Sequence, residues 1–184
     1  MSATDTDTKL SPLDALKERF PAALVSTLHF KGDDSVVVRK DDLVAVMTFL
    51  RDEAGLAFNF LMDVTGVDYL TYPEPRPKRF EVAYHLYSLR WGHRLRVKVQ
   101  VSLGENVPTL SDVWASADWG ERECWEMFGI GFDGHPNLRR LLTHKDFVGY
   151  PLRKDYPVKK RQPLSESDTM VDEMEQRLRF KGLK

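Results

Sequence analysis

The stretch ERECWEMFGIGFDGHPNLRRLLTHKDFVGYPLRKDY, residues 121–156, says most about how this 184-residue chain folds. Three Glu, two His and six Arg or Lys residues share it with several aromatic side chains. Three glycines and a proline fall between positions 129 and 136, a density typical of turns. Residues 111–128 predict one or two short helices that enter the stretch, and beyond Gly129 the sequence loses its periodicity. A folded head therefore ends near residue 128, and an extended segment follows it.

Upstream of that point, the sequence predicts an α+β head domain over residues 11–128, preceded by a disordered tail of residues 1–10. Apolar residues recur at helical spacing in two segments and alternate with polar residues in others. Because helices and strands do not alternate as βαβ units, we expect a two-layer domain with helices against one face of a mixed or antiparallel sheet. The predicted elements are helices from Pro12 to before Pro21 and from Asp42 to Gly55, strands 22–30, 35–39, 58–64, 80–89 and 95–101, and an exposed loop at 73–79.

Residues 129–184 predict a long extended C-terminal arm, with a possible short helix at 165–180. The arm is too long and too irregular for a loop of a compact domain. Between His135 and Arg161, eight Arg or Lys residues against two Asp residues give a local charge of +6. We expect the arm to be mobile in the free protein, where trypsin would trim it from Arg139 onward, and to be ordered along other protein chains.

Composition excludes several classes of protein. Hydrophobic residues make up 42% and charged residues 30% of the chain, as in globular domains. No apolar run approaches the roughly 18 residues of a membrane helix, and the polar N-terminus does not resemble a signal peptide, so we expect a cytoplasmic protein. The single cysteine, Cys124, excludes an internal disulfide and a cluster held by four thiolates of this chain. A net charge of −1 argues against a nucleic-acid partner.

The three glutamates of the quoted stretch have two interpretations. Glu121, Glu123 and Glu126 could be catalytic carboxylates, but no second group or pocket is predicted beside them. We favour a buried ion-pair lattice with arginines, which would serve structure or an interface. The arginines concerned are Arg122, Arg139 and Arg140.

The sequence gives little indication of a metal site, a nucleotide site or a reactive cysteine. His135 and His144 lack the close spacing of zinc ligands, and His135-Pro136 is more typical of a tight turn whose imidazole bonds backbone carbonyls. The glycines from Gly129 to Gly134 do not follow the G-x-G-x-x-G spacing of a nucleotide site. We interpret Cys124 as a small buried side chain, and the aromatic residues around it as core or interface anchors.

The spacing of these residues resembles one family, the 30-kilodalton or C-type subunit of the proton-pumping NADH:quinone oxidoreductase, respiratory complex I. The resemblance covers about thirty-five residues and departs at Glu126, where many members carry Asp. The motif residues, which we expect at partner interfaces, are Glu121, Arg122, Glu123, Glu126, Phe128, Gly129, His135, Pro136, Arg139, Arg140, Leu141, Arg153, Asp155 and Tyr156.

The resemblance implies a protein without catalytic residues or cofactors of its own. The flavin and the iron–sulfur clusters of the complex would lie on other subunits. Its chief partners would be the quinone-site (D) subunit and the terminal-cluster (B) subunit, on the cytoplasmic side of the bacterial plasma membrane. The mechanism would then be positional, because electron transfer to quinone needs those partners held in a fixed arrangement.

Two other functions are compatible with the residues. The chain could be the homologous subunit of a membrane-bound hydrogenase or of a formate-oxidising complex. It could instead be a free-standing hydrolytic or redox enzyme, which would need Glu123, His135 and Cys124 to converge.

Overall fold

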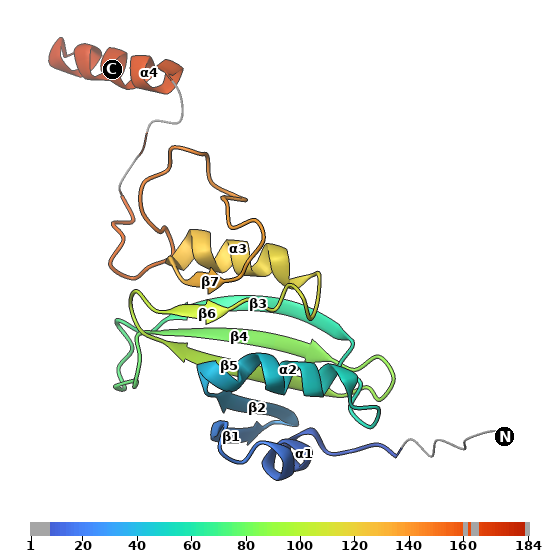
Figure 1. Ribbon diagram of the computed structural model, residues 1–184. Coiled ribbons are helices and arrows are strands. Elements are labelled where there is room, and N and C mark those ends of the chain that lie inside the picture. The colour runs from blue at the N-terminus through green and yellow to red at the C-terminus, as the bar shows by residue number, and fades with distance from the viewer. Residues whose placement is uncertain (1–7, 160–161, 163–165, 183–184) are drawn as a thin grey trace.

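The structure, a computed structural model, describes residues 8–159, 162 and 166–182 (Figure 1). Most of the tail predicted at residues 1–10 therefore lies outside the described residues. The chain forms a sheet with helices packed on it, followed by a long irregular segment and a last helix, α4 (Glu166–Phe180), that projects away from the sheet (Figure 1).

Five strands form the main sheet in the order β1–β2–β5–β4–β3. All neighbours pair antiparallel except β2 and β5, which are parallel, so the sheet is mixed. The predicted α+β class and mixed sheet are confirmed. The strands are β1 Leu24–Phe30, β2 Asp33–Val38, β3 Phe60–Asp68, β4 Phe80–Tyr87 and β5 Arg94–Val101.

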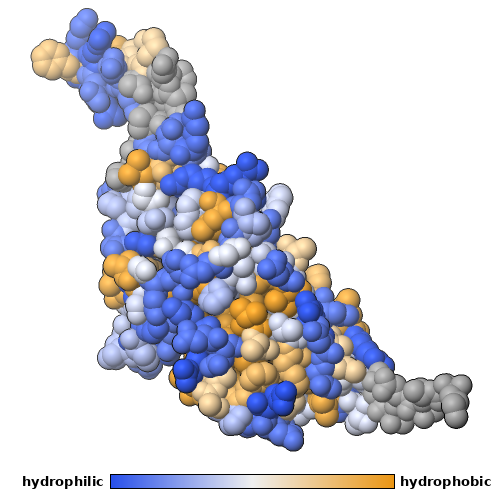
Figure 2. All heavy atoms as spheres, viewed as in Figure 1, coloured by the Kyte–Doolittle hydropathy of each residue, from blue (hydrophilic) through white to orange (hydrophobic). Residues whose placement is uncertain are grey.

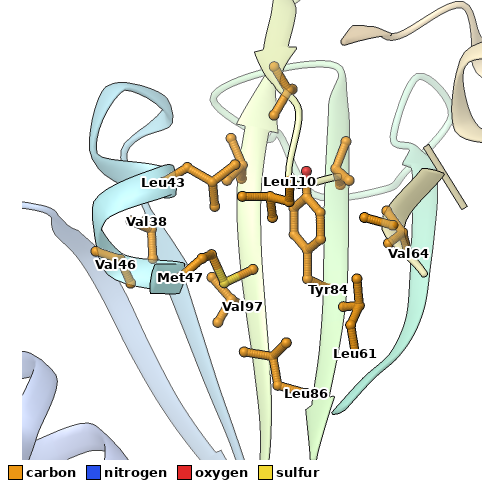
Figure 3. Packing of buried hydrophobic residues seen from close by; sticks show 14 of the residues in the cluster. Val38, Leu43, Val46, Met47, Leu61, Val64, Tyr84, Leu86, Val97 and Leu110 are labelled. Carbon is orange, nitrogen blue, oxygen red and sulfur yellow. The ribbon is translucent and has the colours of Figure 1, made fainter. Parts of the chain in front are cut away.

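Two helices pack on this sheet and build the core. In α2 (Leu43–Asp52, preceded by the short 3-10 helix η1, Lys40–Asp42), the buried residues Leu43, Val46, Met47 and Leu50 recur at helical spacing. They meet side chains of β2 and β5, while the core continues through Tyr84 toward β3 (Figure 3). The second helix, α3 (Ala117–Phe128), packs on β3. A smaller helix, α1 (Pro12–Arg19), begins at the predicted proline.

Strand β3 is longer than the sequence predicted. It ends at Asp68 rather than at 64, and Gly66 within it lets the end of α3 approach closely. A Cβ at Gly66 would lie 2.6 Å from the Phe128 ring, so a side chain there would push α3 off the strand. A glycine inside a strand marks such a close approach, and the predicted strand, 58–64, stopped short of it.

Residues 111–116 form turns, so the region from 111 to 128 contains a single helix, the lower of the two predicted numbers. One detail around α3 was not predicted. Two three-residue strands, β6 (Asn106–Pro108) and β7 (Gly131–Asp133), precede and follow α3 in the sequence and pair in parallel. Strands this short leave no periodic pattern in a sequence.

The C-terminal part of the chain is mostly irregular, as predicted, and α4 coincides with the helix predicted at 165–180. Every side chain described in α4 is exposed, and the helix is largely hydrophilic on the side seen in Figure 2. Among the described residues, no helix is long and apolar enough to span a membrane.

Candidate functional site

The candidate site lies where the end of α3 meets residues 139–156, a segment named here the strap. Gly129 ends α3 in a left-handed conformation, with φ of 71°, and donates its N–H to the Trp125 carbonyl at 2.8 Å. This glycine cap turns the chain out of the helix so that it can return across it. The strap then crosses α3 and bonds to the head at several points.

Glu126 is the central attachment point of the strap. Its buried carboxylate accepts the N–H groups of Leu141 at 2.6 Å and Leu142 at 2.9 Å, and both the N–H and the hydroxyl of Thr143. Burial alone would raise the pKa of Glu126, but these hydrogen bonds outweigh it and hold the pKa at about 2. A fixed negative charge therefore holds three successive backbone amides of the strap.

Arginine side chains hold the strap from the other direction, by donating to carbonyls. Arg122 donates to the carbonyl of Arg139 at 3.1 Å and to that of Arg140 at 3.3 Å. Arg140 in turn donates to the Phe147 carbonyl at 2.7 Å and to the Thr143 hydroxyl at 2.9 Å. The predicted ion-pair lattice is therefore wrong: across the described part of the chain, these arginines form no ion pair with the three glutamates of the motif. The main hydrogen-bond partners of these arginines are backbone carbonyl groups instead.

Glu121 is completely buried and binds the loop before α3. It accepts the Leu110 N–H at 2.7 Å and the Thr109 hydroxyl at 2.5 Å. Burial raises the pKa of Glu121, and the two hydrogen bonds counteract that rise only in part. The carboxyl group therefore fixes the loop from β6 to α3.

His135 makes the tight turn that the sequence indicated. Its side chain is buried, Nε2 lies 3.2 Å from the Asp118 carbonyl, and Nδ1 accepts the Asn137 N–H at 3.0 Å. With Nδ1 as acceptor, the proton of a neutral ring lies on Nε2, which donates to Asp118. The neighbouring Pro136 is exposed at the outside of this turn.

A second attachment point, which the sequence analysis missed, holds the far end of the strap. Arg79 donates to the buried carboxylate of Asp68 at 2.8 and 3.0 Å and to Asp155 at 2.9 and 3.1 Å. Asp68 also accepts the Lys154 N–H at 2.9 Å. Asp68 and Arg79 flank the proline-rich loop, outside any motif, so only Asp155 was singled out in advance.

Between the two attachment points, aromatic and backbone contacts keep the strap on the head. Arg153 donates to the Phe128 carbonyl, and its guanidinium lies 4.1 Å from the ring centre of Tyr150. Leu152 donates its N–H to the Met127 carbonyl at 3.1 Å. Tyr156 stacks on Phe147 with ring centres 6.0 Å apart.

These contacts change one expectation about the arm. Its residues 139–156 were expected to be ordered only on a partner, but they bind the head of the same chain. Whether the head ends functionally at residue 128 stays a prediction.

The remaining candidate residues are not brought together. Glu123 is exposed, and the thiol of Cys124 is buried 3.5 Å from the Val64 carbonyl. Burial raises the pKa of Cys124. His135 forms a hydrogen bond with the Asp118 carbonyl. The three residues that a free-standing enzyme would need together, Glu123, Cys124 and His135, therefore have different surroundings. Within the described residues, no cluster of His, Cys, Asp or Glu could hold a metal ion.

Fold and site together define a class, a two-layer α+β domain whose last head helix holds a C-terminal strap by its carboxylate. The chain belongs to the family described as respiratory-chain NADH dehydrogenase, 30 Kd subunit, whose family model matches residues 36–162. The match includes most of the sheet, α3 and the whole strap.

Curated relatives agree with this family. The chain is 44% identical over 144 residues to the C-type NADH-quinone oxidoreductase subunit of Geotalea uraniireducens, covering 78% of this chain and 84% of that protein. It is 48% identical over 140 residues to the protein of the same name from Caulobacter vibrioides, covering 76% and 68%. A Bdellovibrio bacteriovorus protein, named as a joint C/D subunit, is 49% identical over 139 residues, but the match spans only 24% of its length.

Solved structures show the same fold. One, described as Nqo5 of the trypsin-resistant fragment (1-134), superposes with a TM-score of 0.61 at 38% identity and covers 70% of this chain and all of that one. A chain of the membrane-bound sulfane sulfur reductase, an archaeal respiratory membrane complex, has a TM-score of 0.67 at 21% identity, covering 80% and 84%. The second likeness concerns the fold alone.

Proposed function

We propose that this chain is a non-catalytic subunit of the peripheral arm of a proton-translocating NADH:quinone oxidoreductase. It would hold the quinone-site (D) subunit and the terminal-cluster (B) subunit in a fixed arrangement on the cytoplasmic side of the plasma membrane. Flavin and iron–sulfur clusters would belong to partner subunits, and nucleic acid would not be a partner. Family membership supports the complex, and the site supports the role within it.

The observation that carries this role is the use made of the buried acids. Glu121, Glu126 and Asp68 bind backbone N–H groups or an internal arginine, so these acids position the chain itself. The strap that they help to hold turns apolar side chains outward: Leu142, Val148 and Leu152 are 63%, 67% and 51% exposed. Rigidly held, outward-facing apolar residues are typical of a surface prepared for a protein partner.

The joint C/D relative supports the choice of the D subunit. Its name joins both subunits in one protein, of which this chain resembles about a quarter. Joining two modules in one chain works when the two lie close together in the assembly, because the linker then raises their effective concentration.

The test is to isolate the complex by a tag on this chain. We expect D and B subunits, flavin, iron and NADH-dependent quinone reduction to copurify from solubilised membranes, with crosslinks from residues 139–156 to D or B. Nickel and hydrogen oxidation would point to the hydrogenase relative, and turnover by the isolated chain would point to a free-standing enzyme. Either result would overturn the proposal.

A further inference from the structure

A groove runs along the contact between α3 and β3, the edge strand of the sheet. Its volume is about 540 Å³, and it is lined among others by Met62, Asp63, Trp119, Glu123, Leu141 and Leu142. The helix and the strand approach closely beside it, where a Cβ added to Gly120 would lie 2.8 Å from Val64. The groove is therefore a fixed feature of the packing of α3 on β3.

Large apolar side chains at the groove are left in solvent. Trp119 is 65% exposed, Leu142 63% and Met62 49%, although each stands next to a packed core. The Arg122 guanidinium lies 6.0 Å from the ring centre of Trp119 and leaves most of the indole uncovered. An exposed tryptophan beside other apolar residues is typical of the centre of a protein interface.

The charge at this groove has a single sign. Asp63 and Glu123 are both exposed, and no Lys or Arg of the described residues lines the groove. Asp63 accepts the Thr65 hydroxyl, and across the described ranges neither acid forms an ion pair with a Lys or Arg side chain. The motif acids Glu121 and Glu126 bind groups of this chain, so Asp63 and Glu123 are the carboxylates at this groove that are open to another chain.

We propose that this groove binds an apolar segment of a neighbouring protein in the complex that carries a Lys or Arg residue. An apolar side chain would bury against Trp119, and the basic group would lie between Asp63 and Glu123. The inference rests on the proposed function, since it names the chemistry of one partner contact. Complementary charge would set the register of that segment, while burial of the indole would supply most of the affinity.

The strap builds one wall of the groove. Leu141 and Leu142 line it, and their N–H groups are the ones that Glu126 binds. The groove is therefore complete only when the strap is attached, so the internal carboxylate prepares the external surface. The strap itself cannot be the occupant, because its backbone is already fixed.

The first measurement is oxidative footprinting of Trp119 and Met62 in the tagged complex and in the isolated chain. We expect at least a fivefold fall in oxidation of both residues on assembly. Equal oxidation in the two states would overturn the inference. Protection in the isolated chain that disappears on dilution would also overturn it, since the occupant would then be a second copy.

The second measurement compares D63K/E123K and W119A with the matched control E74K, whose side chain is 79% exposed in the proline-rich loop. We expect the first two to lower incorporation into the complex at least fivefold with unchanged thermal midpoints of the isolated chains, and the control to behave as the parent chain. Normal incorporation of both groove variants would contradict us. If the parent chain copurifies with a complex that does not oxidise NADH, the proposed function fails, while footprinting still decides the groove.

Discussion

At the scale of single residues, Glu126 is the most consequential side chain, and E126Q is the change that tests it. Glutamine keeps the shape but removes the charge and one acceptor, so three backbone amides of the strap lose a charged partner. Hydrogen bonds to charged groups contribute about 1.5–3 kcal/mol, and we expect E126Q to lower the free energy of unfolding by about 2–3 kcal/mol. Denaturant unfolding measures this, with the exposed E123Q as a control that changes nothing.

The difference in stability between the parent chain and E126Q should depend on pH. The pKa of Glu126 falls from an ordinary value of 4.5 to about 2 on folding. A lowered carboxyl pKa contributes stability above the unfolded pKa and loses it as pH falls toward the folded one. The difference in stability between the parent chain and E126Q should therefore be constant above about pH 5.5 and shrink as pH falls from about 4.5 to 2. A difference that grows on acidification would contradict the role of this carboxylate.

Several charged residues that bind the strap stood out in the sequence, but the groups that they bind did not, and their role at a partner interface stays a prediction. Glu121, Arg122, Glu126 and His135 all stood out, because charged residues at that density are unusual beside turns. Many of their acceptors and donors are backbone groups of loops up to 18 residues away, and every residue carries such groups. No residue type therefore marked them, and opposite charges nearby suggested ion pairs instead.

At the scale of elements, Gly129 joins α3 to the strap, and G129A tests that junction. Alanine is strained at φ of 71°, and its Cβ would meet the Arg153 side chain and lie 2.6 Å from Tyr150. We expect a loss of about 2–3 kcal/mol in thermal or denaturant unfolding. Gly92 provides the matched control, since it has φ of 67° with no atom within 4 Å of a Cβ. G92A should cost about 1 kcal/mol, so equal losses would show that the strap does not pack there.

Arg79 joins the proline-rich loop to the end of the strap. R79L would leave the carboxylate of Asp68 buried without its partner, and removing one member of a buried pair costs about 3–5 kcal/mol. Since Arg79 keeps 15% exposure, we expect a loss at the lower end, about 3 kcal/mol in denaturant unfolding. R76L removes a more exposed arginine of the same loop, whose contacts are the Tyr69 and Tyr72 rings and the exposed Glu74, and it should cost clearly less stability than R79L. Similar losses in both variants would exclude a special role for Arg79.

Helices and strands with a strong local sequence pattern were predicted most closely. The stripe of α2 and the alternation in β5 located those elements closely, because burial imposes the period. The pairing of β6 with β7 was not predictable, since three residues carry no period and their partner lies beyond a helix. The role of Gly66 was not predictable, because it depends on Phe128, far along the chain.

At the scale of the whole molecule, the strap contacts revise where trypsin should cut the free chain. Cleavage needs local unfolding, and Arg139, Arg140 and Arg153 lie in or beside hydrogen-bonded backbone. We expect the first cuts at exposed sites beyond the strap, such as Lys159 and Arg177. Mass spectrometry of the early fragments measures this.

R79L supplies the control for that digestion, because releasing the strap should move the first cuts to residues 139–154. Early cleavage at Arg139 in the parent chain would show that the strap binds the head only weakly. The global charge pattern could not distinguish these outcomes: a local charge of +6 is equally compatible with a partner and with the acids of the chain's own head.

The parallel seam between β2 and β5 has a consequence for biosynthesis. Its partners, such as Val36 and Val97, lie far apart in the chain. On the ribosome, the β1–β2 hairpin emerges long before β5, so the inner edge of β2 waits unpaired while the intervening chain is made. Closing a loop of this length is slow compared with hairpin formation, so the seam should be the slow step of folding. During that interval a valine-rich edge is open to other nascent chains.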